Sequence, residues 1–342
     1  MYAAPLEESE WVEPLTSNEA RLAPRPLTEE EKEHFVAHGW LRLTDCFTKE
    51  QADWVNQDVW TRLGMDPNDK STWAQRTNMP CHRTFDASVF SPKAWSAINE
   101  LCAGRQLHDS REWRDSLIVN LGSDEYEGKE THPHELDNWH VDGDFFVHYL
   151  DSPEQALLVI PIFSDISPGG GGTMICPEGI PKVARYLYDH PEGVSPRMIP
   201  RGHPDFEAEK TLDWFNTTAR SCENFVEAHG KVGDVFLLHP LMLHSASRNP
   251  LRQLRIITNP PVFFREPQCF DRPDGDYSLV ERVTLRALGK ESLPGWKITR
   301  PREMRVPERI RIQQKMREEE KQRLQQAALT PPLAAEPPAA AA

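Results

Sequence analysis

Residues 138–146 read Asn138-Trp139-His140-Val141-Asp142-Gly143-Asp144-Phe145-Phe146, a stretch that combines strand-forming residues with two metal-binding side chains. His140 and Asp142 stand two positions apart, which in a strand places both side chains on the same face. Aromatic and β-branched neighbours favour a strand, and Gly143 provides a point where it can bend. We therefore expect His140 and Asp142 to project together as two ligands of one metal ion.

The same His-X-Asp spacing recurs in His203-Pro204-Asp205. Pro204 removes a backbone donor, which is typical of a loop, so we interpret this copy as a chance match. The spacing alone is therefore weak evidence for a metal site, and the first copy needs support from other residues.

That support lies in the apolar run of residues 233–246, which contains His239 and His244. Pro240 ends regular strand pairing, so packing at a strand end is at least as good an interpretation of His239 as ligation. His244 is the better third ligand. Two histidines and one carboxylate form the ligand set with which proteins hold Fe(II) while leaving positions open for substrate and O₂.

Arg255 follows in a short apolar run, residues 254–257. A buried guanidinium needs a partner, and its planar fork matches a carboxylate such as the distal one of 2-oxoglutarate. Two alternatives remain for Arg255: it pairs with an internal Asp or Glu, or the face of its strand is exposed to solvent. Arg248 and Arg252 lie in loop-like sequence that is typical of surface charges.

The order of these motifs resembles the phytanoyl-CoA dioxygenase family of Fe(II)/2-oxoglutarate-dependent oxygenases, over most of residues 27–265. Residues 164–177, with four glycines at 169–172, are similar to that family's central hairpin, where a glycine-containing turn joins two core strands. A phosphate-binding role for these glycines is disfavoured because no Lys-Ser/Thr pair follows them. The resemblance implies a mainly β fold with flanking helices, a double-stranded β-helix (jelly-roll, cupin-like) barrel with the metal at its mouth.

The resemblance also has departures. Ala246 stands where the family often has a serine, and residues 177–180 lack the family's Pro-Gly-Ser-His run. Asp142 is present, whereas related halogenases replace this carboxylate with a small residue, so oxidation of the substrate is favoured over halogenation. Asn120 and Thr173 are further candidates for cosubstrate contacts, chosen from their strand positions.

We predict an Fe(II)/2-oxoglutarate-dependent oxygenase that hydroxylates or otherwise oxidises a small organic molecule with O₂, releasing succinate and CO₂. His140, Asp142 and His244 would bind iron, and Arg255 would bind 2-oxoglutarate. The alternatives are a cupin-type metal enzyme that works without 2-oxoglutarate and a non-catalytic jelly-roll binding protein.

Composition narrows the possible partners and location. The net charge of −14 disfavours nucleic acid and gives no attraction to anionic membranes. No apolar run approaches the roughly 20 residues that span a bilayer, and the six cysteines show no zinc-type pairing and suit a reducing compartment. We expect a cytoplasmic protein with a small-molecule substrate, and the oligomeric state is left open.

The chain is expected to form one domain with tails. Residues 1–26 are an N-terminal extension, 27–300 the oxygenase domain, and 301–342 a charged, solvated helix followed by a disordered Ala/Pro tail. Within the domain, residues 178–230 form either a lid over the barrel mouth or an inert surface excursion. Capping-box spacings predict helix starts at Thr28 and Thr48, the second helix running toward Leu63.

Overall fold

The computed structural model describes residues 22–104, 107–207 and 211–329, so most of the N-terminal extension and the Ala/Pro tail lie outside it. Both predicted helix starts are confirmed. Thr28 caps α2 (Glu29–His38) and Thr48 caps α3 (Lys49–Asn56), each through a complete capping box. The second helix is shorter than expected, because the chain leaves helical hydrogen bonding after Asn56 and resumes it in α4 (Val59–Leu63).

The strands form four antiparallel groups. The largest sheet has the order β1-β9-β6-β12, and two three-stranded sheets have the orders β10-β7-β8 and β11-β5-β2, beside a β3-β4 pair. The bounds are β1 (Trp40–Leu43), β2 (Arg76–Asn78), β3 (Thr84–Asp86), β4 (Glu112–Arg114), β5 (Ile118–Asn120), β6 (Leu157–Pro161), β7 (Thr173–Cys176), β8 (Val226–Ala228), β9 (Val235–Leu238), β10 (Leu243–Ala246), β11 (Arg255–Ile257) and β12 (Pro261–Val262).

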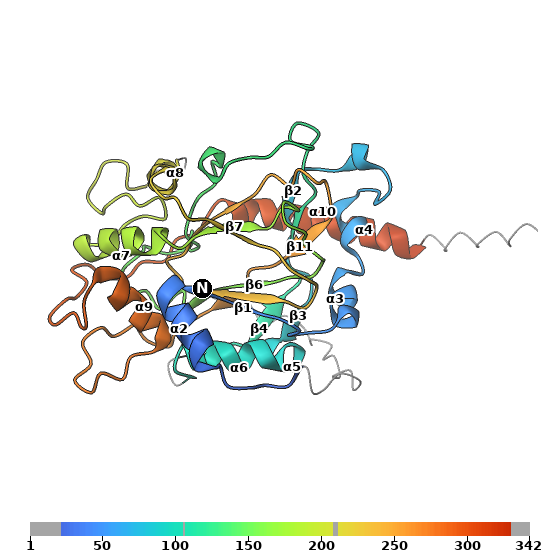
Figure 1. Cartoon of the computed structure of the whole chain (residues 1–342). Helices are drawn as coiled ribbons and strands as arrows, with labels where there is room; N and C mark the ends of the chain where they lie inside the picture. The colour runs from blue at the N-terminus through green and yellow to red at the C-terminus, as the bar shows by residue number, and fades with distance from the viewer. Residues whose placement is uncertain (1–21, 105–106, 208–210, 330–342) are drawn as a thin grey trace, which may run out of the picture.

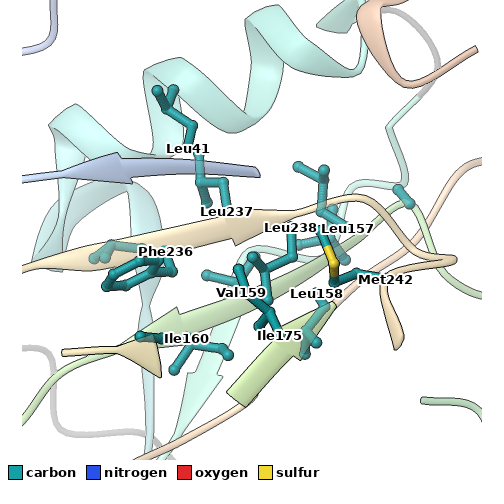
Figure 2. Close-up of a cluster of buried hydrophobic side chains, with 14 of the residues drawn as sticks. Leu41, Leu157, Leu158, Val159, Ile160, Ile175, Phe236, Leu237, Leu238 and Met242 are labelled. Carbon is teal, nitrogen blue, oxygen red and sulfur yellow. The ribbon is translucent and has the colours of Figure 1, made fainter. Parts of the chain in front are cut away.

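The main hydrophobic core lies between the largest sheet and the β10-β7-β8 sheet. Figure 2 shows Ile175 of β7 beside Leu158 and Val159 of β6, and Met242 belongs to the same cluster of buried side chains. Every residue of β6 and of β9 is buried, so these strands are covered on both faces. Burial on both faces explains why their sequences are continuous apolar runs without alternation.

Helices cover the outer side of the largest sheet (Figure 1). α2 packs on β1 and on α9 (Leu279–Leu288), and α7 (Gly179–Asp189) packs on α9 and β10. The remaining helices are α5 (Ala87–Phe90), α6 (Pro92–Leu101), α8 (Asp213–Arg220), α10 (Arg309–Leu329) and the 3₁₀ turns η2 (Lys70–Thr72) and η4 (Pro133–Glu135). Among the described residues, no helix combines the length and apolar character needed to cross a membrane.

Two expectations about the fold need correction. The fold is mixed α/β and not mainly β: the longest strand has five residues, whereas α10 alone has 21. The strands of the described ranges form open sheets that do not close into one barrel. Among the described residues, neighbouring sheets are linked by single bridges such as Ile162↔Ile257 and not by a continuous ladder.

The glycine-rich segment also differs from the predicted hairpin. Its flanking strands β6 and β7 lie in different sheets and do not pair with each other. After β6, Ile162 forms an isolated β-bridge with Ile257, and Ile166 forms one with Gly230. The chain therefore passes from one sheet to the next before it reaches the glycines. This segment is therefore a crossing between sheets.

Candidate metal centre

His140 and His244 are held side by side by their own backbones. The amide of each donates to the carbonyl of the other, at 3.0 Å from His140 N and 2.9 Å from His244 N. His244 lies in β10, but the predicted strand around His140 is reduced to this single bridge. The chain cannot extend the ladder because it turns at Gly143, whose φ is +118°.

The Asp142 carboxylate faces both imidazoles. Its Oδ1 lies 3.6 Å from His140 Nε2 and 3.5 Å from His244 Nε2. One donor atom from each of the three residues lies within 4.8 Å of the other two. Neighbouring ligands about 2.1 Å from a metal ion stand about 3 Å apart, so this cluster needs only a small contraction to hold one.

The imidazole tautomers suit metal binding. His140 Nδ1 lies 2.7 Å from the carbonyl of Asn138, and His244 Nδ1 lies 3.0 Å from the carbonyl of Met242. A carbonyl oxygen can only accept, so each Nδ1 carries the proton and each Nε2 presents a bare lone pair toward Asp142. The donor set therefore fits a divalent transition metal.

The charges of the three ligands are coupled. Burial lowers the pKa of His140, and the neighbouring His244 lowers it further. Burial acts against the charged form of Asp142, but the two imidazoles that face the carboxylate hold its pKa well below the usual range. Burial also acts against protonation of His244, yet Asp142 leaves the pKa of His244 raised overall. The carboxylate is therefore anionic, as a ligand must be.

Asn259 is a site residue that the sequence motifs do not identify. Its Nδ2 donates to Asp142 Oδ2 at 3.1 Å, which leaves Oδ1 directed at the histidines. Asn259 lies just after β11, and no spacing rule connects it with His140. An amide that orients a ligating carboxylate is a common outer partner of metal sites.

The other histidines considered from sequence lie elsewhere. His239 is fully buried, with Nε2 3.2 Å from the carbonyl of Val280 and 3.1 Å from Thr284 Oγ1, so it packs against α9. His203 and Asp205 form an exposed pair outside the cluster. The interpretation of both as non-ligands agrees with their positions.

Arg255 is a buried cation, 1% exposed, with no carboxylate partner within the described ranges. Its Nε donates to the carbonyl of Gly171 at 2.7 Å and its Nη1 to that of Ile118 at 3.3 Å. Burial lowers the pKa of Arg255 to about 9, and the charge of Arg76 contributes. The alternative of an internal acidic partner is thus not found.

The glycine amides are occupied by an internal carboxylate. Glu227 accepts from Gly169 N at 2.7 Å and from Gly172 N at 3.0 Å. This contact fixes the turn from which the Gly171 carbonyl reaches Arg255. The turn therefore positions Arg255, and its outer amides are not free for a phosphate.

Asn120 and Thr173 lie near the predicted site but their cosubstrate roles stay predictions. Asn120 pairs with Arg255 across the β5–β11 ladder, and its Nδ2 donates to the carbonyl of Ser247 at 2.9 Å. Thr173 is buried and pairs with Ala246 of β10.

The interpretation of Arg252 as a surface charge is wrong. Arg252 is 3% exposed and forms an ion pair with Asp124. Arg248 is partly exposed and pairs with Asp137 at 3.3 Å. Unlike Arg255, both of these neighbouring arginines therefore already have carboxylate partners.

Comparisons with known proteins find similar solved structures at low sequence identity. No family model and no curated protein matches the sequence, so the resemblance to the phytanoyl-CoA dioxygenase family stays a prediction. HygX from Streptomyces hygroscopicus, solved with nickel and 2-oxoglutarate bound, is 15% identical at a TM-score of 0.38, covering 70% of this chain and 86% of its own.

EctD from S. alaskensis, in its apoform, is 19% identical at a TM-score of 0.38, covering 76% of this chain and 80% of its own. EvdO2 from Micromonospora carbonacea var. aurantiaca is 14% identical at a TM-score of 0.37, covering 72% and 96%. At such identities and scores, the function has to be argued from the site itself.

Proposed function

We propose that this protein is an Fe(II)/2-oxoglutarate-dependent oxygenase that hydroxylates or otherwise oxidises a small organic molecule. The observation that carries the proposal is the cluster of His140, Asp142 and His244, in which two bare Nε2 atoms and one carboxylate oxygen converge. Arg255 adds the buried cation that a dicarboxylate cosubstrate requires.

Each residue has a defined task in this proposal. His140 and His244 donate Nε2 lone pairs, and Asp142 supplies one negative charge, so a bound dication keeps a net positive charge for anionic ligands. Bound iron would supply the activation of O₂, with 2-oxoglutarate oxidised to succinate and CO₂ as the substrate is oxidised. Asn259 holds the Asp142 carboxylate in orientation through Oδ2.

The orientation of the Arg255 guanidinium favours binding of a carboxylate. Backbone carbonyls fix its Nε and Nη1, while Nη2 has no hydrogen-bond partner in the part of the chain that the structure describes. The guanidinium is thus rigid and incompletely satisfied. A carboxylate on Nη2 would satisfy the remaining donors and neutralise a buried charge.

An anaerobic titration of purified protein with Fe(II) and 2-oxoglutarate tests the proposal. Wild type should develop the visible metal-to-ligand charge-transfer band of a chelated keto acid. Arg255→Gln should weaken 2-oxoglutarate binding by roughly tenfold or more while iron binding is kept, because a charged hydrogen bond is lost.

The two His-X-Asp copies provide a matched control for the metal site. Asp142→Ala should abolish the band, whereas Asp205→Ala, at the exposed copy, should leave it unchanged. Bound iron without any band would favour the enzyme that works without 2-oxoglutarate. Absence of iron binding in wild type would favour the non-catalytic binding protein.

A further inference from the structure

A row of polar side chains crosses the β11-β5-β2 sheet. Arg255 pairs with Asn120, and Asn120 pairs with Arg76 on the other side. Directly opposed residues of antiparallel strands point to the same face of a sheet. Asn78, two residues after Arg76, shares that face. The edge strand β2 thus adds a guanidinium and an amide to the face that carries Arg255.

This face is turned toward the segments that carry the metal ligands. From it, Asn120 Nδ2 donates to the carbonyl of Ser247, three residues after His244. Asp137, three residues before His140, is near enough to Arg76 for their charges to interact. The Asn120 hydrogen bond, together with this charge interaction, indicates that the row of polar side chains lies beside the candidate metal centre.

The positive charge of this face is not balanced internally. Within the described ranges, the side chains of Arg76 and Asn78 are exposed and form no hydrogen bond or ion pair. Asp137 is already paired with Arg248, and Glu227 is bound to two glycine amides. Two arginines thus share one face without a bound carboxylate, in a chain whose net charge is −14.

We propose that the primary substrate carries a carboxylate that is bound by Arg76 together with Asn78. This inference rests on the proposed function, in which Arg255 binds the distal carboxylate of 2-oxoglutarate. The outer strands of a three-stranded sheet lie roughly 10 Å apart, so Arg76 and Arg255 have room for two separate carboxylates. A planar guanidinium beside an amide matches one carboxylate group.

The test uses protein loaded anaerobically with Fe(II) and 2-oxoglutarate. The probes are acetate, hexanoate, phenylacetate and indole-3-acetate, each beside its uncharged amide, and hexyl phosphate. Binding is followed by calorimetry and by the change in the charge-transfer band. At least one carboxylate should bind more tightly than its amide and more tightly than hexyl phosphate.

Arg76→Gln should weaken binding of that carboxylate roughly tenfold or more, and Asn78→Ala should weaken it by a smaller factor. Neither variant should change the affinity for 2-oxoglutarate by more than about twofold. Arg114→Gln removes the same charge from an exposed position on β4 and should leave both affinities unchanged.

The inference would be overturned if no carboxylate is preferred over its amide, if hexyl phosphate binds best, or if Arg76→Gln leaves carboxylate binding intact. Loss of 2-oxoglutarate affinity in Arg76→Gln would assign Arg76 to the cosubstrate instead and also overturn it. Failure of the proposed function is distinguishable, because wild type would then lack the charge-transfer band. The same probe titration on protein loaded with Fe(II) alone would still test the carboxylate site.

Discussion

His239 and His244 belong to one apolar run, yet of the two only His244 lies in the candidate metal-binding cluster. His239 is enclosed by α9, and burial lowers its pKa to about 3. The signal that separates the two in sequence is Pro240, which ends strand pairing after His239. Each imidazole contacts a residue that is distant in sequence: Val280 for His239 and Asp142 for His244. These contacts cannot be derived from the apolar run itself.

The buried His239 should make stability fall in mild acid. Its folded pKa lies below the ordinary value near 6.5, so below that pH the unfolded chain binds the extra proton and is favoured. From pH 7.5 to 5.5 this histidine should cost about 1.4 kcal/mol of unfolding free energy. Urea unfolding of wild type and His239→Gln at both pH values measures the difference.

Glutamine keeps an N–H donor for the Val280 carbonyl but cannot titrate, so its unfolding free energy should fall less between the two pH values. His148, whose pKa burial lowers to about 4, is present in both proteins and cancels in the comparison. Equal pH dependence of the two proteins would show that His239 is not buried in its neutral form.

At the level of elements, local signals were sufficient for helix starts but not for strand partners. The capping boxes at Thr28 and Thr48 involve residues three positions apart, so the sequence contains the whole interaction. The partners of β6 and β7 come from residues far along the chain, and the predicted hairpin between them is absent. The cluster of His140, Asp142 and His244 could be predicted because few residue types bind metal ions, whereas Asn259 has no such signature in the sequence.

The glycine turn allows a matched test of how Arg255 is positioned. A Cβ on Gly171 would lie 2.7 Å from Asn249 Cβ, while a Cβ on Gly169 would have nothing within 4 Å. Both residues have positive φ, so both alanine variants carry about 1–2 kcal/mol of backbone strain. Gly171→Ala should lose about 1–3 kcal/mol more through the clash, and its shifted carbonyl should weaken 2-oxoglutarate binding.

Urea unfolding and the anaerobic 2-oxoglutarate titration check both effects, with Gly169→Ala as the control for backbone strain. Equal 2-oxoglutarate affinity in the two variants would mean that the Gly171 carbonyl does not position Arg255. Iron binding should be the same in both, because neither glycine contacts a metal ligand.

At the scale of the whole molecule, the C-terminal helix is tied to the sheet that carries Arg255. Most of α10 is exposed, as its charged sequence predicts, but Glu320 is buried and its Oε2 accepts from Arg62 Nε at 2.9 Å. Arg62 also pairs with Asp115 at 3.0 Å, just before β5. Glu318, Glu319 and Glu320 are alike in sequence, so only contacts with distant residues, Arg62 and His82, distinguish the buried residue.

This network should make one of two adjacent glutamates important for stability. Glu320→Gln removes a buried charge that faces Arg62 and should cost about 1–3 kcal/mol of unfolding free energy, since Asp115 still compensates part of the cation. Glu319→Gln loses only an exposed pair with Lys315 and should change stability by less than about 0.5 kcal/mol. Both substitutions change the net charge equally, so urea unfolding isolates the effect of burial. Equal stability of the two variants would mean that the buried Glu320 carboxylate does not contribute to the docking of α10.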